Sequence, residues 1–434
     1  MAETQPRLMN ILILGLNYLP ESTSIGPYTA DLAEYLRSRG HDARVTAGFP
    51  TAPQWKVWRG YEGKWFQDET INGVPVQRTY LYVPRNPRQT LQRILFDCSF
   101  ALSALRSAVQ RWSPEVVVVI SPPLQLGITG LVLAALNRSR MLLVIKDLVP
   151  DAAIAVGAIR PGSAVCRLAH TLERFVYRRA TGIAVICDGM RRNLIAKGVP
   201  AGKVVVLPDY IDLSFIKPQT APNRFRAQFG IPEDQFLAMY SGSVAGKQGL
   251  QTFIQAAAEL ESNRDIACCL IGEGPYLPEL KQLAASLALN RFLFLPLQPR
   301  ENLAAQLSAA DALVITQREA VRDVVFPGKL LYYMASGTAI LAGVNEDSET
   351  GRFIREHNTG IVVPPETPGR LAEAIRWMRD NPERTRHLGL NGRRTAEALF
   401  DRSVVLKKFA AYIEGGFESR APAVDQLHPT PGVR

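Results

Sequence analysis

The segment Tyr240-Ser-Gly-Ser-Val-Ala-Gly-Lys-Gln-Gly-Leu250 decides how the second half of this 434-residue chain is interpreted. The apolar run Phe236–Tyr240 before it predicts a buried strand, and Gln251–Leu260 after it shows helical spacing of apolar residues. Glycines in a strand-to-helix turn let the backbone approach a ligand, and the helix end presents free N–H groups. Lys247 adds a charge suited to phosphate. The turn alone fits a phosphate site and an ordinary glycine-rich connection equally well.

Size and composition describe a globular protein. A chain of 434 residues exceeds one hydrophobic core, so we expect two domains of roughly 200 residues. The five cysteines are odd in number and lack metal-type spacing, and the adjacent Cys268 and Cys269 are expected to be small buried hydrophobes. With no signal-peptide core and no apolar run of roughly 18–20 residues, we expect a reduced, cytoplasmic setting.

The net charge of +10 is concentrated in the first half. Residues 1–213 contain 25 Lys and Arg against 16 Asp and Glu, whereas residues 214–434 contain 25 against 24. No nucleic-acid motif accompanies this surplus. A membrane with anionic lipid, or an acceptor that carries phosphate, fits it better, and a scattered solvated surface is the alternative.

The start of the chain predicts a parallel α/β unit. The strand candidate Asn10–Leu14 is followed by a polar loop, by a helix that ends at Gly40 and by a second strand, Val45–Ala47. The loop lacks a tight Gly-x-Gly-x-x-Gly, so a nicotinamide dehydrogenase is poorly supported. It is better suited to shaping a cleft. We expect irregular structure over residues 50–92.

The segment Leu91–Trp112 predicts a helix with a broad apolar face and several arginines beside it. A well-buried helix is the favoured interpretation, and a helix that lies against the membrane interface is the alternative. Further strands of this half are expected at Val116–Ile120, Met141–Ile145, Ile183–Ile186 and Val204–Leu207. Asp147 follows one of them, at the edge where parallel sheets place their ligands.

The second half predicts another doubly wound α/β domain, with short strands alternating with helices. These strands are expected at Phe236–Tyr240, Ala267–Ile271, Phe292–Leu295, Ala312–Ile315, Ala339–Leu341 and Ile361–Val363. We place the domains at residues 1–212 and 213–401, and we expect a helix at about 402–418 to pack back on the first domain. Residues 421–434 are expected to be disordered.

Several strand ends of the second half carry polar or glycine-rich turns. They are Gly242–Gly249, Gly272–Pro275, Pro296–Gln298 and Thr316–Lys329. Their convergence is more specific than any single turn. It predicts a nucleotide site with phosphates near Gly242, Lys247 and Lys329, and with the base near Pro296–Gln298.

At this point the sequence resembles a known family, the glycosyltransferases of the GT-B fold in family four, from about Asn10 to Phe417. The matching stretches are Asn17–Gly26, Asp147–Asp151, Pro208–Asp212, Tyr240–Leu250, Gly272–Pro275, Pro327–Gly337 and Asn391–Arg394. Within the family it is most similar to the colanic acid and exopolysaccharide type. The resemblance implies two doubly wound, Rossmann-like domains that face a central cleft.

The resemblance also implies a function. It is a retaining transfer of a sugar from a nucleoside diphosphate to a glycan acceptor, without a bound metal or other cofactor. The acceptor is expected to be lipid-linked at the cytoplasmic face of the inner membrane, with peripheral membrane contact and no nucleic-acid partner. The implied catalytic residues are Asp147, Lys247 and Lys329. The implied donor-binding residues are Gly242, Ser243, Gly246, Lys247, Gly272, Gly274, Leu297, Pro327, Lys329 and Leu330, and the acceptor-binding residues are Asn17, Tyr18, Gly26 and Asp147.

The chain departs from the family pattern at four positions. Ser243 stands where a cation is usual, which leaves Lys247 and Lys329 for that role. Val324 and Tyr332 stand where the family has two glutamates, and Lys146 replaces a histidine. Two other hypotheses stay open. One is a sugar-nucleotide epimerase or hydrolase of the same fold, and the other, which the missing glutamates suggest, is a non-catalytic binding partner in a polysaccharide assembly complex.

Overall fold

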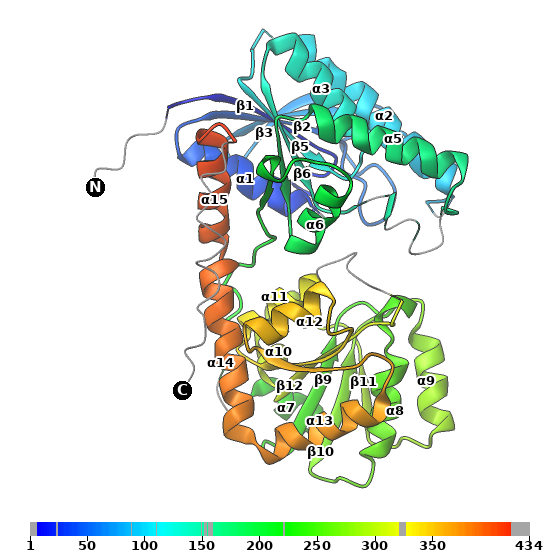
Figure 1. The fold of residues 1–434 in the computed structure, drawn as a ribbon. Helices are drawn as coiled ribbons and strands as arrows, with labels where there is room; N and C mark the ends of the chain where they lie inside the picture. Colours follow the sequence, from blue (N-terminus) through cyan, green and yellow to red (C-terminus); the bar gives the residue numbers. More distant parts are fainter. Residues whose placement is uncertain are drawn as a thin grey trace, which may run out of the picture. The chain divides into compact units, whose positions relative to one another are not determined.

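The structure, a computed structural model, describes residues 7–22, 25–87, 89–109, 111–148, 150–151, 154, 159–219, 222–320 and 327–417. The chain forms two compact units (Figure 1). The first comprises Met1–Leu207 and Leu406–Arg434, and the second comprises Pro208–Val405. Val324 and the 421–434 tail lie outside the described residues.

The first unit contains a sheet in the order β3-β4-β2-β1-β5-β6-β7-β8, in which only β3 runs antiparallel to its neighbour. The strands are β1 Asn10–Gly15, β2 Asp42–Gly48, β3 Phe66–Ile71, β4 Val74–Thr79, β5 Val116–Ser121, β6 Arg140–Ile145, β7 Gly182–Val185 and β8 Val204–Val206. Central strands such as β5 are buried along their whole length. This is why they read as continuous β-branched runs rather than as alternating patterns.

The strands β3 and β4 correct the expectation of irregular structure over residues 50–92. They form a hairpin in which Ile71 pairs with Val74 across the two residues Asn72 and Gly73. Both turn residues have positive φ, 50° and 77°. This is the backbone that Asn-Gly favours in two-residue hairpins, so the dipeptide was the local signal for the pair of strands.

The helices of the first unit connect these strands. They are α1 Gly26–Ser38, α2 Thr90–Ser103, the 3-10 helix η1 Ala104–Val109, α3 Leu126–Asn137, α5 Ala164–Arg179, α6 Asp188–Ala196 and the short η2 Ala201–Lys203. The helix expected over Leu91–Trp112 thus ends at Ser103 and continues as a tighter turn.

The second unit contains a parallel sheet in the order β11-β10-β9-β12-β13-β14. Numbered within the unit, this is the order 3-2-1-4-5-6 of doubly wound nucleotide-binding folds. The strands are β9 Phe236–Ser241, β10 Ile266–Ile271, β11 Phe292–Leu295, β12 Ala312–Thr316, β13 Ala339–Gly343 and β14 Gly360–Val363. All six strands predicted for this half are confirmed. The order reverses between β9 and β12, where such sheets bind their ligands.

Helices cover both faces of the second sheet. They are α7 Arg224–Phe229, α8 Gln251–Glu259, α9 Leu277–Ser286, α10 Leu303–Ser308, α11 Gly328–Ala335, α12 Glu349–Glu356, α13 Pro368–Asp380 and α14 Pro382–Leu399, with the short turns η3 Gly246–Gln248 and η4 Arg300–Asn302. Alternate residues of β9 enter opposite cores: Met239 belongs to one apolar cluster and Tyr240 to the other. The strand is therefore held from both sides.

The last described helix, α15 Arg402–Glu414, follows α14 and enters the first unit at Leu406. Its terminal Glu414 accepts hydrogen bonds from Arg39 Nε at 2.7 Å and contacts the buried His41 Nε2 at 3.0 Å. These contacts lower the pKa of the Glu414 carboxyl, against the opposing effect of its burial. The end of α15 is thereby bonded to the connection between α1 and β2.

Candidate active site

The carboxyl ends of β9 and β12 bring two predicted loops together at the switch point of the second sheet. The β9 loop leads through η3 into α8, and its turn is fixed from the β12 side. The Thr316 hydroxyl donates to the Gln248 carbonyl at 2.6 Å, and the Arg318 amide donates to the Lys247 carbonyl at 3.2 Å. Lys247 itself is exposed. The turn is thus anchored by its backbone while its ammonium group stays accessible.

Lys329 lies against Tyr240. Its Nζ donates to the Tyr240 hydroxyl at 2.5 Å and lies 4.0 Å from the centre of that ring. The same hydroxyl donates to the Ser243 carbonyl at 2.6 Å, so it accepts from the lysine. Because Tyr240 is fully buried, it holds the lysine in one place. Burial raises the pKa of the Tyr240 phenol.

The pKa of Lys329 falls to about 7, first because the ammonium is desolvated and second because Lys247 is close enough to repel it. A desolvated ammonium group is stabilised when an anion binds beside it. Lys247 and Lys329, the two lysines predicted to bind phosphate, are therefore close enough to affect each other's charge.

Gly242 and the glycines after β10 let these loops approach one another. Gly242 has a φ of +148°, and a Cβ there would lie 3.3 Å from Lys329 Nζ. A Cβ at Gly272 would lie 2.0 Å from the Gly242 carbonyl oxygen, and one at Gly274 would lie 2.0 Å from that of Val244. Side chains at these positions would collide with backbone, so the close contact between the loops requires glycine.

Arg318 is a cation of this edge that the sequence analysis did not name. Its Nη2 would be 3.8 Å from a Cβ on Gly246, and its guanidinium lies 6.0 Å from the centre of the Tyr276 ring. The only sequence signal was its place, two residues after the strand that borders the switch point. Where Ser243 lacks the usual cation, Arg318 provides positive charge from the neighbouring loop.

The remaining donor-site predictions fall into exposed and buried positions. Leu297 is 53% exposed, and Pro327 caps the N-terminus of α11. Leu330 is fully buried in the core, so a ligand could reach it only through its backbone. Tyr332 is 37% exposed, whereas Val324, the other position without its glutamate, lies outside the described residues.

Tyr333 and Gln306 fix the end of β9 from beneath. The Tyr333 hydroxyl accepts from the Ser241 amide and donates to the Ser241 carbonyl, both at 2.9 Å, and Gln306 donates to the Ser241 hydroxyl at 2.7 Å. Tyr333 and Gln306 are both buried. The strand end before Gly242 is therefore held through side chains that sequence periodicity marks only as core.

In the first unit, the predicted acceptor loop after β1 is organised by Glu21. This buried carboxylate accepts from the Asn17 side chain at 2.9 Å and from the Thr51 and Ala52 amides at 2.5 and 2.7 Å. Gly26 starts α1, and a Cβ there would lie 2.9 Å from the Glu21 carbonyl oxygen. The loop is closed by side chains and by contacts with the loop after β2.

Tyr18 and Arg78 lie beneath this loop. Arg78 is fully buried and donates to Glu69 at 2.6 Å, to the Gly48 carbonyl at 3.0 Å and to the Leu19 carbonyl. Tyr18 is also fully buried, with the guanidinium 5.8 Å from its ring centre. Among the described residues its hydroxyl has no hydrogen-bond partner, and burial raises its pKa. The predicted acceptor residue Tyr18 thus supports the loop, and its side chain does not face solvent.

Asp147 is exposed directly after β6, at the carboxyl edge of the first sheet. The neighbouring Lys146 is buried, and its Nζ lies 5.2 Å from the centre of the Tyr28 ring. An exposed carboxylate at this edge is accessible to an acceptor hydroxyl, as the prediction for Asp147 requires.

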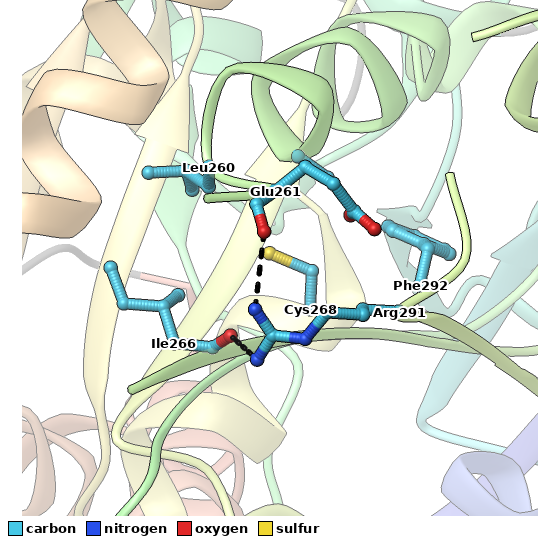
Figure 2. A pocket seen from close by; sticks show the side chains of 7 residues that line it. Leu260, Glu261, Ile266, Cys268, Arg291 and Phe292 are labelled. Atoms are coloured by element: carbon cyan, nitrogen blue, oxygen red, sulfur yellow. Dashed lines mark hydrogen bonds between the residues drawn. The ribbon is translucent and has the colours of Figure 1, made fainter. Parts of the chain in front are cut away.

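A small hollow lies elsewhere, at the amino ends of β10 and β11 (Figure 2). Arg291 fills its polar side and donates to the carbonyls of Glu261, Asn263, Arg264 and Ile266. Cys268, on its wall, is buried, which raises the pKa of its thiol to about 12. Because Arg291 holds the backbone that follows α8 in place, we assign the residues around this hollow a structural role.

Two kinds of feature are absent from the described residues. No three His, Cys, Asp or Glu side chains there group closely enough to hold a metal ion. No helix there has the length and apolar character needed to cross a membrane.

Two family models cover most of the chain. The model "Glycosyl transferase 4-like domain" matches residues 23–209, and the model "Glycosyl transferases group 1" matches residues 222–395. The chain therefore belongs to the glycosyltransferases that these two models describe, and it has the GT-B fold.

Individual relatives agree with this assignment. The WcaI glycosyl transferase of Escherichia coli (strain K12), named for colanic acid biosynthesis, is 30% identical over 414 residues, which are 94% of this chain and 100% of the relative. Sucrose-phosphate synthase from Thermosynechococcus elongatus has a TM-score of 0.71 at 19% identity, covering 94% of this chain and 99% of that one. HepE of Anabaena in complex with UDP has a TM-score of 0.70 at 18% identity, covering 94% and 100%. At these identities the solved structures show the fold alone.

Proposed function

We propose that this enzyme is a retaining, metal-independent glycosyltransferase that moves a sugar from a nucleoside diphosphate to a lipid-linked glycan acceptor in cell-surface polysaccharide synthesis. The observation that carries the proposal is the pairing of Lys247 and Lys329 beside Gly242 at the switch point. The naming of the WcaI relative for colanic acid biosynthesis supports the polysaccharide role. HepE was solved with UDP and with UDP-glucose, which supports a nucleotide-sugar donor.

The chemistry assigns each group a task. Breaking the bond between the anomeric carbon and the phosphate oxygen leaves its electron pair on the diphosphate and positive charge on the sugar. Lys247 and Lys329 stabilise the diphosphate, and Arg318 adds charge from the β12 loop. A preorganised hydrogen-bond donor aimed at the developing negative charge is typically worth about 3–4 kcal/mol to the transition state when water is excluded from the site.

The acceptor side of the proposal uses the first unit. The acceptor hydroxyl attacks from the face that the diphosphate leaves, and a departing phosphate oxygen takes its proton. The configuration of the sugar is thereby retained, and no dedicated protein base is required. Asp147 orients the hydroxyl and assists the proton transfer. Asn17 and the backbone near Gly26 contact the acceptor on the loop that Glu21 holds.

A panel of nucleotide sugars, each incubated with and without membrane extract, tests the function. Release of nucleoside diphosphate that depends on the extract supports the proposal, and the anomeric configuration of the product tests retention. Acceptor-free conversion would instead identify an epimerase or hydrolase, and donor binding without any turnover would identify a non-catalytic partner.

The variant Lys247→Ala tests the phosphate assignment. We expect a loss of about 10²–10³ in kcat/KM with an unchanged unfolding midpoint, because the side chain is exposed. The matched variant Lys281→Ala removes a lysine of α9 and is expected to retain turnover. Wild-type turnover in Lys247→Ala would contradict the assignment.

A further inference from the structure

Three adjacent helices of the first unit, α2, α3 and α5, present an unusual outer surface, which we call the α2-α3-α5 face. The helix α3 contacts both α2 and α5. Its Thr129 hydroxyl donates to the Ala101 carbonyl of α2 at 2.6 Å, and a Cβ on its Gly127 would touch Val176 of α5 at 2.5 Å. The three helices therefore form one continuous layer rather than separate elements.

The α2-α3-α5 face is apolar. Of the eighteen large apolar side chains that are exposed among the described residues, nine lie on these three helices. They are Leu91, Leu95, Leu102, Ile128, Val132, Leu136, Val165, Leu168 and Phe175. Single exposed apolar residues are normal on a protein surface, but a group on adjacent helices marks an interaction site.

The spacing shows that each helix turns a stripe outward. On α2 the stripe runs through Leu91, Leu95 and Leu102, at positions i, i+4 and i+11. On α3 it runs through Ile128, Val132 and Leu136, at successive intervals of four, and this helix contains no charged residue. Both helices also bury an inner face against the protein, so the outer stripes are additional to what the fold requires.

The exposed charged residues of these three helices are all arginines, since the one acid of α2, Asp97, is half-buried. Exposed arginines of α5 include Arg167, Arg174 and Arg178, and none of them forms an ion pair within the described part of the chain. The acidic residue of α5, Glu173, is buried and bonded to Lys197. The helix dipole favours cations in the last turn and so accounts for Arg178, but it does not account for Arg167 near the start.

We propose that the α2-α3-α5 face docks on an anionic lipid surface. Leucine and phenylalanine side chains enter the boundary between head groups and acyl chains, while the arginines of α5 contact lipid phosphates. A second copy of the chain fits less well, because a self-complementary contact would bring the same arginines together with no exposed acid on the three helices to pair them. The inference rests on the proposed function, in which the lipid-linked acceptor lies in a membrane, and it assigns the surface that meets that membrane.

Flotation of the full-length protein with lipid vesicles tests the docking. With vesicles of phosphatidylglycerol and phosphatidylethanolamine we expect binding that weakens as salt is raised, and little binding to pure phosphatidylcholine. The double variant Arg174→Gln/Arg178→Gln should lower the partition coefficient roughly fivefold for each arginine removed. The double variant Leu136→Gln/Leu168→Gln should lower it by at least a similar factor at every salt concentration.

Matched controls change the same residue types on the second unit. Leu390→Gln and Arg370→Gln replace exposed residues there and should leave binding unchanged. Equal binding by the α2-α3-α5 variants and the wild type would overturn the proposal. An absence of vesicle binding by the wild type would also overturn it. If sedimentation then shows a dimer that the Leu136→Gln/Leu168→Gln variant dissociates, the face is an interface between two copies of the chain. Because flotation needs no nucleotide sugar, its outcome is independent of the sugar-transfer assay.

Discussion

The loops after β9 and after β1 occupy equivalent places, since each follows the first strand of a doubly wound sheet. They differ in the residues that form and stabilise them. The β9 loop consists largely of backbone and cations: Gly242 passes close to Lys329, and Lys247 stays exposed. The β1 loop is stabilised from within by buried charged side chains, Glu21 and Arg78. The same topology thus supports two kinds of loop at a strand end. The β9 loop exposes positive charge, and the β1 loop is held by buried charged side chains.

The difference follows from what each loop is proposed to bind. A diphosphate needs N–H groups and positive charge at close range, which glycines and lysines provide. A glycan acceptor offers hydroxyls, which hydrogen-bond to polar side chains and to backbone, so a rigid loop suits it. Four changes test this contrast.

The largest effect is expected for Arg78→Met. It removes a buried guanidinium that donates to the Glu69 carboxylate and to two backbone carbonyls, so we expect a loss of about 3–5 kcal/mol in the free energy of unfolding. Chemical denaturation measures it. Arg106→Met, an exposed arginine stacked 4.4 Å over Phe66, is the control and should change stability by less than about 1 kcal/mol. A similar small change in Arg78→Met would refute the internal bracing.

The next effect concerns Lys329→Met. Without the ammonium group the diphosphate loses one fixed cation, and kcat/KM should fall about 10²–10³-fold while the fold is retained. Steady-state kinetics with the identified donor measures this. Retention of more than a tenth of wild-type activity would remove Lys329 from the catalytic residues.

The pH dependence of the donor KM sharpens the role of the same lysine. With a pKa of about 7, Lys329 is protonated below neutral pH and loses its proton as pH rises. Donor binding needs the charged form, so KM should rise above pH 7, by up to about tenfold per pH unit. Lys329→Arg keeps its charge over this range, and its profile should be flat there. An equally steep profile in that variant would assign the titration to another group.

The smallest change is Gly242→Ala, with Gly246→Ala as its matched partner. At Gly242 the backbone conformation is strained for alanine and the new Cβ reaches Lys329, so we expect about a tenfold loss in kcat/KM. At Gly246 the new Cβ meets only Arg318, at 3.8 Å, and the loss should be smaller. A larger loss in Gly246→Ala than in Gly242→Ala would show that the donor contacts the turn at η3 rather than at Gly242.

Much of the architecture was predictable because hydrophobic pattern is a local property. The six strands of the second sheet are largely apolar runs, and each was placed within a residue or two. The four central strands β9, β10, β12 and β13 are buried almost throughout, whereas the edge strands β11 and β14 are mostly half-buried. The hairpin of β3 and β4 was missed because its strands include polar, half-exposed residues such as Asp68 and Glu69. Its Asn-Gly turn was the available signal.

The candidate site was predictable only in part. Glycines and lysines at strand ends identify a phosphate edge, since parallel strands bring their carboxyl ends together. Sequence gave no sign that Tyr240 would hold Lys329, or that Arg318 would lie beside Gly246. Tyr18 and Leu330 matched the family pattern, yet their side chains are buried.

The sequence by itself determined the two α/β domains, the glycosyltransferase family and the cationic edge, because these depend on periodicity and on the order of motifs along the chain. Only the tertiary structure decided which groups meet. The pairing of Tyr240 with Lys329, the burial of Arg78 beneath the β1 loop and the shared apolar face of α2, α3 and α5 join residues that are distant in sequence. Such contacts depend on strand order and helix packing, which no local pattern encodes.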